Sequence, residues 1–382
     1  MTTATVELDG SRGEGGGQIL RTALALAMIT GRPLRMRRIR AGRAKPGLRR
    51  QHLACVEAAA MLCHAEVRGA TLGSQDLTFV PGAITGGELA IDIGTAGSTT
   101  LVVQTILVPA IAAGRPLRAV ITGGTHNPLA PPFEFLDRVY APHLRAMGAD
   151  LELTLDRHGF ASGGELASDT GGGEPADDAG DLGKARRGRG PRGAAAGAGE
   201  DRRARHGQLT VTVGPGALRP IEVMTAGPIT ARRATAIVAR LPSHVAAREH
   251  AVVQARLGFA PGECEVRDVP AGAPANVLLL EVERAEGREL VSGFGEKGVR
   301  AELVAERACD ALAAFLAADV PVGAHLADQL LLPLAIAGGG QFRAAALTPH
   351  ALTNIATIQH FLELAITVEP GGDGGDAIVR VG

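Results

Sequence analysis

The chain has 382 residues, a formal net charge of −1 at neutral pH, and only 3% Phe, Tyr and Trp. This length suffices for two or three domains, whose cores must be built mainly from Leu, Val, Ile and Ala. A near-neutral chain that is poor in aromatic rings excludes a globally basic nucleic-acid binder and a base-stacking platform, so any nucleic-acid contact must come from a local arginine cluster.

The first hundred residues alternate short apolar strands with helices. The expected strands are 6–9, 34–40, 77–79 and 87–93. The expected helices are the 3.6-residue apolar repeat from Ile19 to Met28, which Gly31 ends, and the segment 50–63.

Small-residue turns followed by helices recur along the chain. They lie at 10–17, 94–98 and 338–340, and in the last case a short strand precedes the helix at 351–362. This recurrence of strand, turn and helix indicates an internally repeated α/β unit.

The segment 163–207 interrupts the pattern. It consists mostly of Gly, Ala and Pro, with an acidic first half, a basic second half and almost no apolar residues. Such a composition cannot bury a core, so we expect a disordered linker. Its arginines could contact RNA, but a solvated linker whose charges compensate one another is the preferred interpretation.

The elements after this linker indicate a second domain. The expected strands are 209–213, 221–224, 263–268 and 277–282, and the expected helices are 231–241 and 299–317. We interpret 226–317 as a small α/β domain inserted into a larger domain, which is formed by 1–162, 208–225 and 318–382.

The cysteines and the apolar runs bear on the compartment. The four cysteines form no CxxC pair, which favours reduced thiols over a zinc site or a disulfide framework. The N-terminus has no apolar signal core, and the longest apolar run, 330–337, is too short to span a bilayer. We therefore expect a soluble cytoplasmic protein.

The glycine-rich stretch from Asp9 to Arg21 is the first candidate site. Its backbone N–H groups at a helix N-terminus could bind an anion, although a turn that needs glycine only for its dihedral angles is the alternative. It has no Lys-Ser/Thr pair of a P-loop, and Gln18 stands where the dinucleotide fingerprint needs glycine. Glu14 either compensates the helix dipole or binds Mg²⁺.

Arginines gather near this stretch. Arg40 and Arg43 lie in a loop that Pro46 and Gly47 fix, and Arg21 projects from the first helix. Guanidinium groups bind phosphate in a forked geometry, which favours a phosphate site, although a solvated basic face is the alternative.

Three histidines are further candidates. His350 lies at a loop–helix junction, and His126 in 125–128 (THNP) and His158 in 157–160 (RHGF) have the same ambiguity. A lone histidine is more often structural than catalytic, so none of the three is decisive by itself.

Together, these motifs resemble the RNA 3′-terminal phosphate cyclase family. The matching segments are 13–21 (GEGGGQILR), 39–48 (IRAGRAKPGL), 51–53 (QHL), 94–98 (GTAGS) through Gln104, 123–125 (GGT) through 131–132 (PP), 326–330 (LADQL), and His350 with 352–355 (LTNI). They occur in order from residue 6 to about residue 365.

The resemblance implies an α/β (α+β) fold of three repeated βαβαββ units, similar to the C-terminal domain of a bacterial initiation factor, with a smaller inserted α/β domain. It also implies ATP-dependent conversion of an RNA 3′-phosphate to a 2′,3′-cyclic phosphodiester. In that reaction a histidinyl-AMP intermediate passes AMP to the RNA end. The expected partners are RNA 3′-phosphate ends, ATP and Mg²⁺ or Mn²⁺, with a homodimer left open.

The resemblance also assigns roles by position. His350 would be the nucleophile and Glu14 would hold the metal. The substrate phosphates would be held by Arg21, Arg40, Arg43 and Gln51. The nucleotide pocket would be lined by Gln104, Pro131, Phe135, His325, Leu326, Ala327, Asp328 and Gln329. His325 stands where many members of the family have tyrosine, so the contact with adenine is open.

Two alternatives share this fold. One is a non-catalytic cyclase-like protein of ribosome assembly, which lacks the histidine. The other is an enolpyruvyl-transferase-like enzyme, which would need a sugar-acid site and no nucleophilic histidine. The presence of His350 speaks against both.

Overall fold

The computed structural model describes residues 4–160, 206–371 and 375–382, and its named strands form four sheets of four strands each. The first sheet has the order β1 (Val6–Asp9), β2 (Leu34–Arg37), β4 (Leu77–Val80) and β3 (Glu66–Arg68). β1 and β2 are parallel, and the other pairs are antiparallel. α1 (Gly17–Thr30) joins β1 to β2, and α2 (Arg50–Cys63) joins β2 to β3.

Two further sheets repeat this connectivity. The second has the order β5 (Gly87–Asp92), β6 (Leu117–Gly123), β8 (Gly207–Val213) and β7 (Leu151–Arg157), with α3 (Thr99–Ala113), α4 (Phe133–Phe135), the π-helix η1 (Leu136–Tyr140) and α5 (Ala141–Ala146). The third has the order β9 (Glu222–Val223), β14 (Gly340–Ala344), β16 (Ala377–Val381) and β15 (Ile366–Pro370), with α10 (Ala324–Ala337) and α11 (Pro349–Phe361). In each sheet the first two strands are parallel, which is consistent with repeated βαβ-type units.

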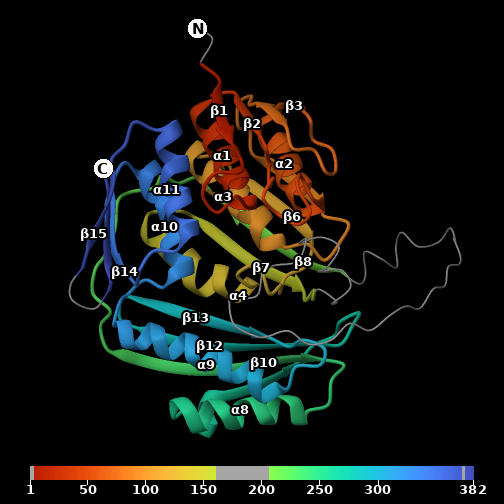
Figure 1. The fold of residues 1–382 in the computed structure, drawn as a ribbon, viewed down its shortest axis with the longest axis vertical. Helices are drawn as coiled ribbons and strands as arrows, with labels where there is room; N and C mark the ends of the chain where they lie inside the picture. The colour runs from red at the N-terminus through yellow and green to blue at the C-terminus, as the bar shows by residue number, and fades with distance from the viewer. Residues whose placement is uncertain (1–3, 161–205, 372–374) are drawn as a thin grey trace, which may run out of the picture.

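The fourth sheet is connected differently. Its order is β11 (Cys264–Asp268), β10 (Ile229–Ala239), β12 (Ala275–Arg284) and β13 (Gly287–Phe294). The 3-10 helix η2 (Pro261–Glu263) precedes β11, and α8 (His244–Leu257) and α9 (Ala301–Ala318) pack on this sheet (Figure 1). In the sequence, all of these elements lie between β9 and α10.

The helices of the three similar sheets form the main core. α1 packs against α2, α3 and α11, so it is apolar on nearly all sides, with Leu20, Leu24 and Leu26 fully buried. It ends at Gly31, whose φ of 66° is a left-handed conformation that glycine adopts without strain. The core therefore places the start of α1, which follows the glycine turn, beside α11 (Figure 1).

The expected helix at 231–241 is wrong, because this segment is the central strand β10. Its alanines and arginines favour a helix, but β10 is paired on both edges, with β11 and β12. Ala234, Ala236 and Val238 face the cluster under α8 and α9, while Ile237 faces the main core. The small alanines allow the two helices to pack close to the sheet, so tertiary packing overrides local propensity.

Most other expected elements are confirmed, with shifted ends. The segment 50–63 is α2 as expected, and 351–362 corresponds to α11. The expected strand 34–40 stops at Arg37, because Arg38 and Arg40 have φ values of 55° and 52°, which no strand adopts.

The expected linker overlaps the described residues only at its end. Residues 163–205 lie outside the described part of the chain. Gly207, expected in the linker, begins β8 and pairs with Gly123, and the Cα of Gly159 lies so close that a Cβ on Gly207 would collide with it. Within the described ranges, none of the helices has the length and apolar character needed to cross a membrane.

Candidate active site

The glycine turn is shaped by contacts that side chains would block. Gly13 and Gly15 have φ values of 59° and 64°. A Cβ on Gly13 would collide with Thr353 of α11, and one on Gly17 would collide with the imidazole of His52. Glycine is therefore required for close approach as well as for backbone conformation.

The start of α11 fixes His350. Thr348 caps the helix by accepting the N–H of Ala351 at 3.2 Å, and Pro349 occupies the first helical turn. The His350 side chain is 53% exposed, so one side of the ring is open to a ligand while its Nδ1 faces the protein.

A hydrogen-bond relay orients the His350 ring. Its Nδ1 lies 2.7 Å from Oε1 of Gln18, and Nε2 of Gln18 donates to Oδ1 of Asp328. Because a carboxylate oxygen accepts this bond, the Gln18 amide must turn its oxygen toward His350. Nδ1 of His350 is then the donor, which leaves the lone pair on Nε2 for attack.

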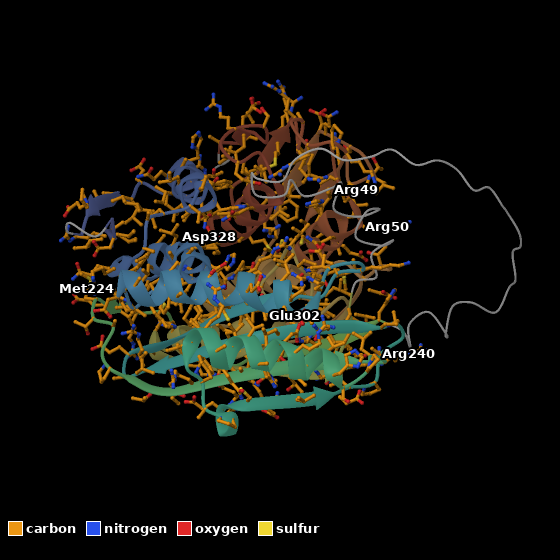
Figure 2. The ribbon with its side chains drawn as sticks, turned by 60° about the horizontal axis from the view of Figure 1, so that its bottom comes forward. Arg49, Arg50, Met224, Arg240, Glu302 and Asp328 are labelled. Carbon is orange, nitrogen blue, oxygen red and sulfur yellow. The ribbon has the colours of Figure 1, made fainter. Side chains whose placement is uncertain are left out.

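Two further side chains hold the relay. Asn354 donates from Nδ2 to Oδ1 of Asp328 at 2.9 Å and to its carbonyl oxygen at 3.0 Å. Thr22 donates to Oδ1 of Asn354 at 2.8 Å. Asp328 thus joins α10 to α1 and α11, and it lies where the C-terminal segments meet the N-terminal ones (Figure 2).

The environment of His350 favours the neutral imidazole. Burial lowers the pKa of His350, and Arg21 and Arg43 lower it further, while Asp328 acts in the opposite direction. A pKa below the usual value of about 6.5 leaves the ring uncharged at neutral pH. The relay and the charges therefore both favour a neutral ring whose lone pair is on Nε2.

Glu14 lies beside this ring. Its Oε1 forms an ion pair with Arg43, and its backbone N–H donates to Oγ1 of Thr353 at 3.0 Å. Its Oε2 lies 3.7 Å from Nδ1 of His350, and this buried atom has no hydrogen-bond partner among the described residues. A buried carboxylate oxygen of this kind suits a divalent cation.

Two of the expected phosphate ligands are engaged with the protein. Arg40 is 4% exposed and donates to the carbonyl oxygens of Lys45 at 3.0 Å and Gly47 at 2.9 Å. Oε1 of Gln51 accepts the N–H of Ser98 at 2.7 Å, which links α2 to the second small-residue turn. Both side chains hold the loops that surround the site.

Arg21 faces a small cavity between α1, α3 and α10. The cavity measures about 50 Å³, and Gln104, Asp328 and Gln329 contribute to its wall. Nε2 of Gln104 and Oε1 of Gln329 are buried without hydrogen-bond partners among the described residues. Arginine stays charged even though burial lowers the pKa of Arg21, so this wall offers a ligand a cation, one unpaired amide donor and one unpaired amide acceptor.

The other expected nucleotide contacts differ in exposure. The buried side chains are Phe135, Leu326 and Ala327. The exposed ring of His325 meets the edge of Phe135 at 6.1 Å between centroids, with an interplanar angle of 87°. The carbonyl oxygen of Pro131 accepts a hydrogen bond from Thr100 at 2.9 Å. Contact of these residues with a nucleotide stays a prediction.

His126 and His158 lie together in another part of the fold. Their rings stack at 5.3 Å between centroids, and Nε2 of His126 lies 2.8 Å from Oε2 of Glu134. Burial acts to raise the pKa of Glu134, but His126 outweighs it and lowers this pKa to about 2. The bond between His126 and Glu134 is a buried interaction that links the loop after β6 to α4.

Sequence reasoning missed the side chains that orient His350. The matching segments include Gln18, Thr353 and Asn354, but the sequence assigned no role to these three residues. Residues 350, 353 and 354 have the i, i+3, i+4 spacing of one helix face, which is the only local signal for their cooperation. Gln18 and His350 are 332 positions apart, so their contact is visible only in the fold.

Comparison with known proteins completes the description of the site. The family model described as RNA 3'-terminal phosphate cyclase matches residues 12–368. A protein of that name from Ectopseudomonas mendocina is 46% identical over 96% of this chain and 95% of its own length. Proteins of the same name from Koribacter versatilis and Salmonella enteritidis are each 41% identical, over 95% and 98% of this chain and 91% and 98% of their own lengths.

Proposed function

The chain belongs to the RNA 3′-terminal phosphate cyclase family, and from this premise we propose that it converts an RNA 3′-phosphate into a 2′,3′-cyclic phosphodiester with the use of ATP. The observation that carries the proposal is the relay from Asp328 through Gln18 to His350, which leaves a neutral Nε2 free at the edge of the site. A non-catalytic relative or an enolpyruvyl-transferase-like enzyme would have no use for this nucleophile.

The first step is transfer of AMP to the protein. Nε2 of His350 attacks the α-phosphorus of ATP, a P–N bond forms, and the bond to the pyrophosphate oxygen breaks. Positive charge develops on the imidazole, and the bond from Nδ1 to Gln18 stabilises it. Arg21 and Arg43 supply positive charge near the ring for the phosphates.

The second and third steps close the ring. An oxygen of the RNA 3′-phosphate attacks the phosphorus of the histidine-bound AMP, the P–N bond breaks, and the RNA end carries AMP. The neighbouring 2′-hydroxyl loses its proton and attacks the 3′-phosphorus, and AMP leaves. A phosphate monoester has no good leaving group, so adenylylation provides one.

Glu14 is the residue that would hold Mg²⁺ or Mn²⁺. Its free, buried Oε2 beside His350 supports this role, while Oε1 stays paired with Arg43. A bound divalent cation supplies charge neutralisation for the phosphate oxygens. Gln104 and Gln329, with their unpaired amide atoms, would offer polar contacts to an edge of the nucleotide beside Arg21, because the cavity of about 50 Å³ is too small for the whole nucleotide.

We also propose the domain division expected from the sequence. The three sheets of shared strand order would be the initiation-factor-like units of the large domain, and 226–317 would be the inserted domain. The separate apolar cluster under α8 and α9 supports this division. The homodimer and the cytoplasmic location stay predictions.

Conversion of an RNA end tests the proposed function. An oligonucleotide with a labelled 3′-phosphate is incubated with the protein, ATP and Mg²⁺ or Mn²⁺, and then with a phosphatase. We expect the label to become resistant to the phosphatase only when ATP is present. A label that stays sensitive with folded wild-type protein would contradict the proposal.

A further inference from the structure

A basic groove lies next to the candidate active site, on the far side of the glycine turn. It has a volume of about 410 Å³, and its wall includes Arg12, Arg35, Arg37 and Arg38. Glu7 and Asp9 are the acidic residues of this wall. We call this feature the arginine groove.

The arginine groove carries excess positive charge. Arg38 pairs with Asp9 at 3.2 Å, and Arg35 lies 4.0 Å from Glu7 in an exposed pair that contributes little. Arg12 and Arg37 are exposed and have no ion pair within 4.0 Å in the described ranges. Four guanidinium groups against two carboxylates leave the groove positive, although the whole chain is nearly neutral.

The groove follows the helix that carries the nucleophile. Thr353, Thr357 and His360 of α11 line it, and with His350 they form one stripe along the helix. At 1.5 Å per residue this stripe is about 15 Å long. Its near end is closed by the contact of Gly13 with Thr353, one residue from Glu14, so the groove ends beside the candidate active site.

The arginines are not a requirement of the fold. In the first sheet, Glu7 is opposite Arg35 and Asp9 is opposite Arg37. In the second sheet, which has the same strand order, Glu88 is opposite Arg118, but Ala90 is opposite Val120. The repeated unit thus forms without a second arginine on this face, so the fold itself does not require Arg37.

We propose that the arginine groove binds backbone phosphates of the RNA strand that leads to the 3′-phosphate. The inference rests on the proposed function and extends it to the nucleotides behind the reacting end. Arginines in an exposed groove bind phosphate in a forked geometry, and phosphates carry no sequence information. No Phe, Tyr or Trp lines the groove, so it offers contacts to phosphates and no aromatic ring on which a base could stack.

The test compares a long and a short substrate. Substrates are a 20-nucleotide RNA and a dinucleotide, both with a 3′-phosphate, and the variant is Arg12→Ser with Arg37→Ser. At 0.2 M salt we expect the substitutions to raise the KM for the long RNA about tenfold more than the KM for the dinucleotide. At 0.05 M salt this difference should be about sevenfold larger, because each of the two lost phosphate contacts contributes about 0.7 to the slope of log affinity against log salt concentration. The matched control is Arg115→Ser with Arg118→Ser, which changes two exposed arginines outside the groove.

Binding of a 20-nucleotide RNA with a 3′-hydroxyl, measured by fluorescence anisotropy, gives a second readout that needs no turnover. A shallower salt dependence for the Arg12 and Arg37 variant supports the groove. The proposal would be refuted if the variant, the control and the wild type had the same affinity for this RNA and the same ratio of KM for the long RNA to KM for the dinucleotide. Wild-type protein that cyclises neither RNA would instead refute the proposed function, so the two failures are distinguishable.

Discussion

Replacing Gln18 by Met removes the centre of the relay that orients His350. The substitution deletes the acceptor of the Nδ1–H bond and the donor to Asp328, while Met fills a similar volume. Nδ1 is then free to lose its proton, and the lone pair is no longer confined to Nε2. Asp328 keeps its bonds from Asn354.

The expected loss follows from the charge that develops on the ring. A hydrogen bond to a charged group contributes about 1.5–3 kcal/mol, and the bond from Nδ1 gains this strength only as the imidazole becomes cationic. Since about 1.4 kcal/mol corresponds to a tenfold change in rate, adenylylation slows by about 10- to 150-fold. The KM for ATP changes little, because Gln18 acts on His350.

The assay is single-turnover transfer of labelled AMP from ATP to the protein. Thr30→Ala, at the other end of α1, is the matched control, because Thr30 bonds only within its own helix, to Leu26. Gln18→Glu distinguishes an effect on His350 from an effect on folding, because Glu keeps an acceptor for the Nδ1–H bond and changes the charge beside the ring. Its carboxylate raises the pKa of His350, so the rate should fall off at a higher pH than in the wild type. A Gln18→Met rate within threefold of the wild type, in folded protein, would refute the reasoning.

Three further predictions concern titration and metal binding. Wild-type adenylylation stays level from pH 8 down to about 6.5 and falls only below it, because burial lowers the pKa of His350, so an inflection above 6.5 in the pH–rate profile would contradict the account. Glu14→Gln raises the Mg²⁺ or Mn²⁺ concentration for half-maximal rate by about tenfold or more, and an unchanged metal titration would exclude Glu14 as a ligand. Burial raises the pKa of Glu289 from 4.5 to about 7, so the folded state holds the extra proton and its stability falls as pH rises through this window. Glu289→Gln removes this pH dependence. Urea unfolding should show that the free energy of unfolding of the variant, relative to that of the wild type, is higher at pH 8 than at pH 5 by about 1–3 kcal/mol.

Local signals in the sequence were sufficient for most of the fold. The glycine turn before α1, the small-residue turn before α3 and the cap at Thr348 each act within a few residues, so the repeated unit could be predicted. The strand β10 could not, because alanine and arginine favour a helix. Its state depends on pairing with β11 and β12, whose paired residues lie about 30 to 55 positions away in the sequence.

The sequence was sufficient to name candidate site residues, but it did not indicate the hydrogen bonds that connect them. Glu14, Arg43 and His350 lie together in the fold, while the roles that the resemblance assigns to them stay predictions. The use of Gln18 to orient His350 was not predictable, because it depends on a contact across the whole chain. Arg40 was expected to bind phosphate, but the fold shows it donating to carbonyl oxygens of its own loop, which no spacing rule indicates.

Labelling of the protein with AMP tests the central claim most directly. Wild-type protein and His350→Ala are incubated with α-labelled ATP and Mg²⁺ or Mn²⁺, and the label is followed through acid and alkali. The account predicts acid-labile, alkali-stable label on the wild type and none on the variant. Label of the same stability on folded His350→Ala protein would contradict the assignment of the nucleophile.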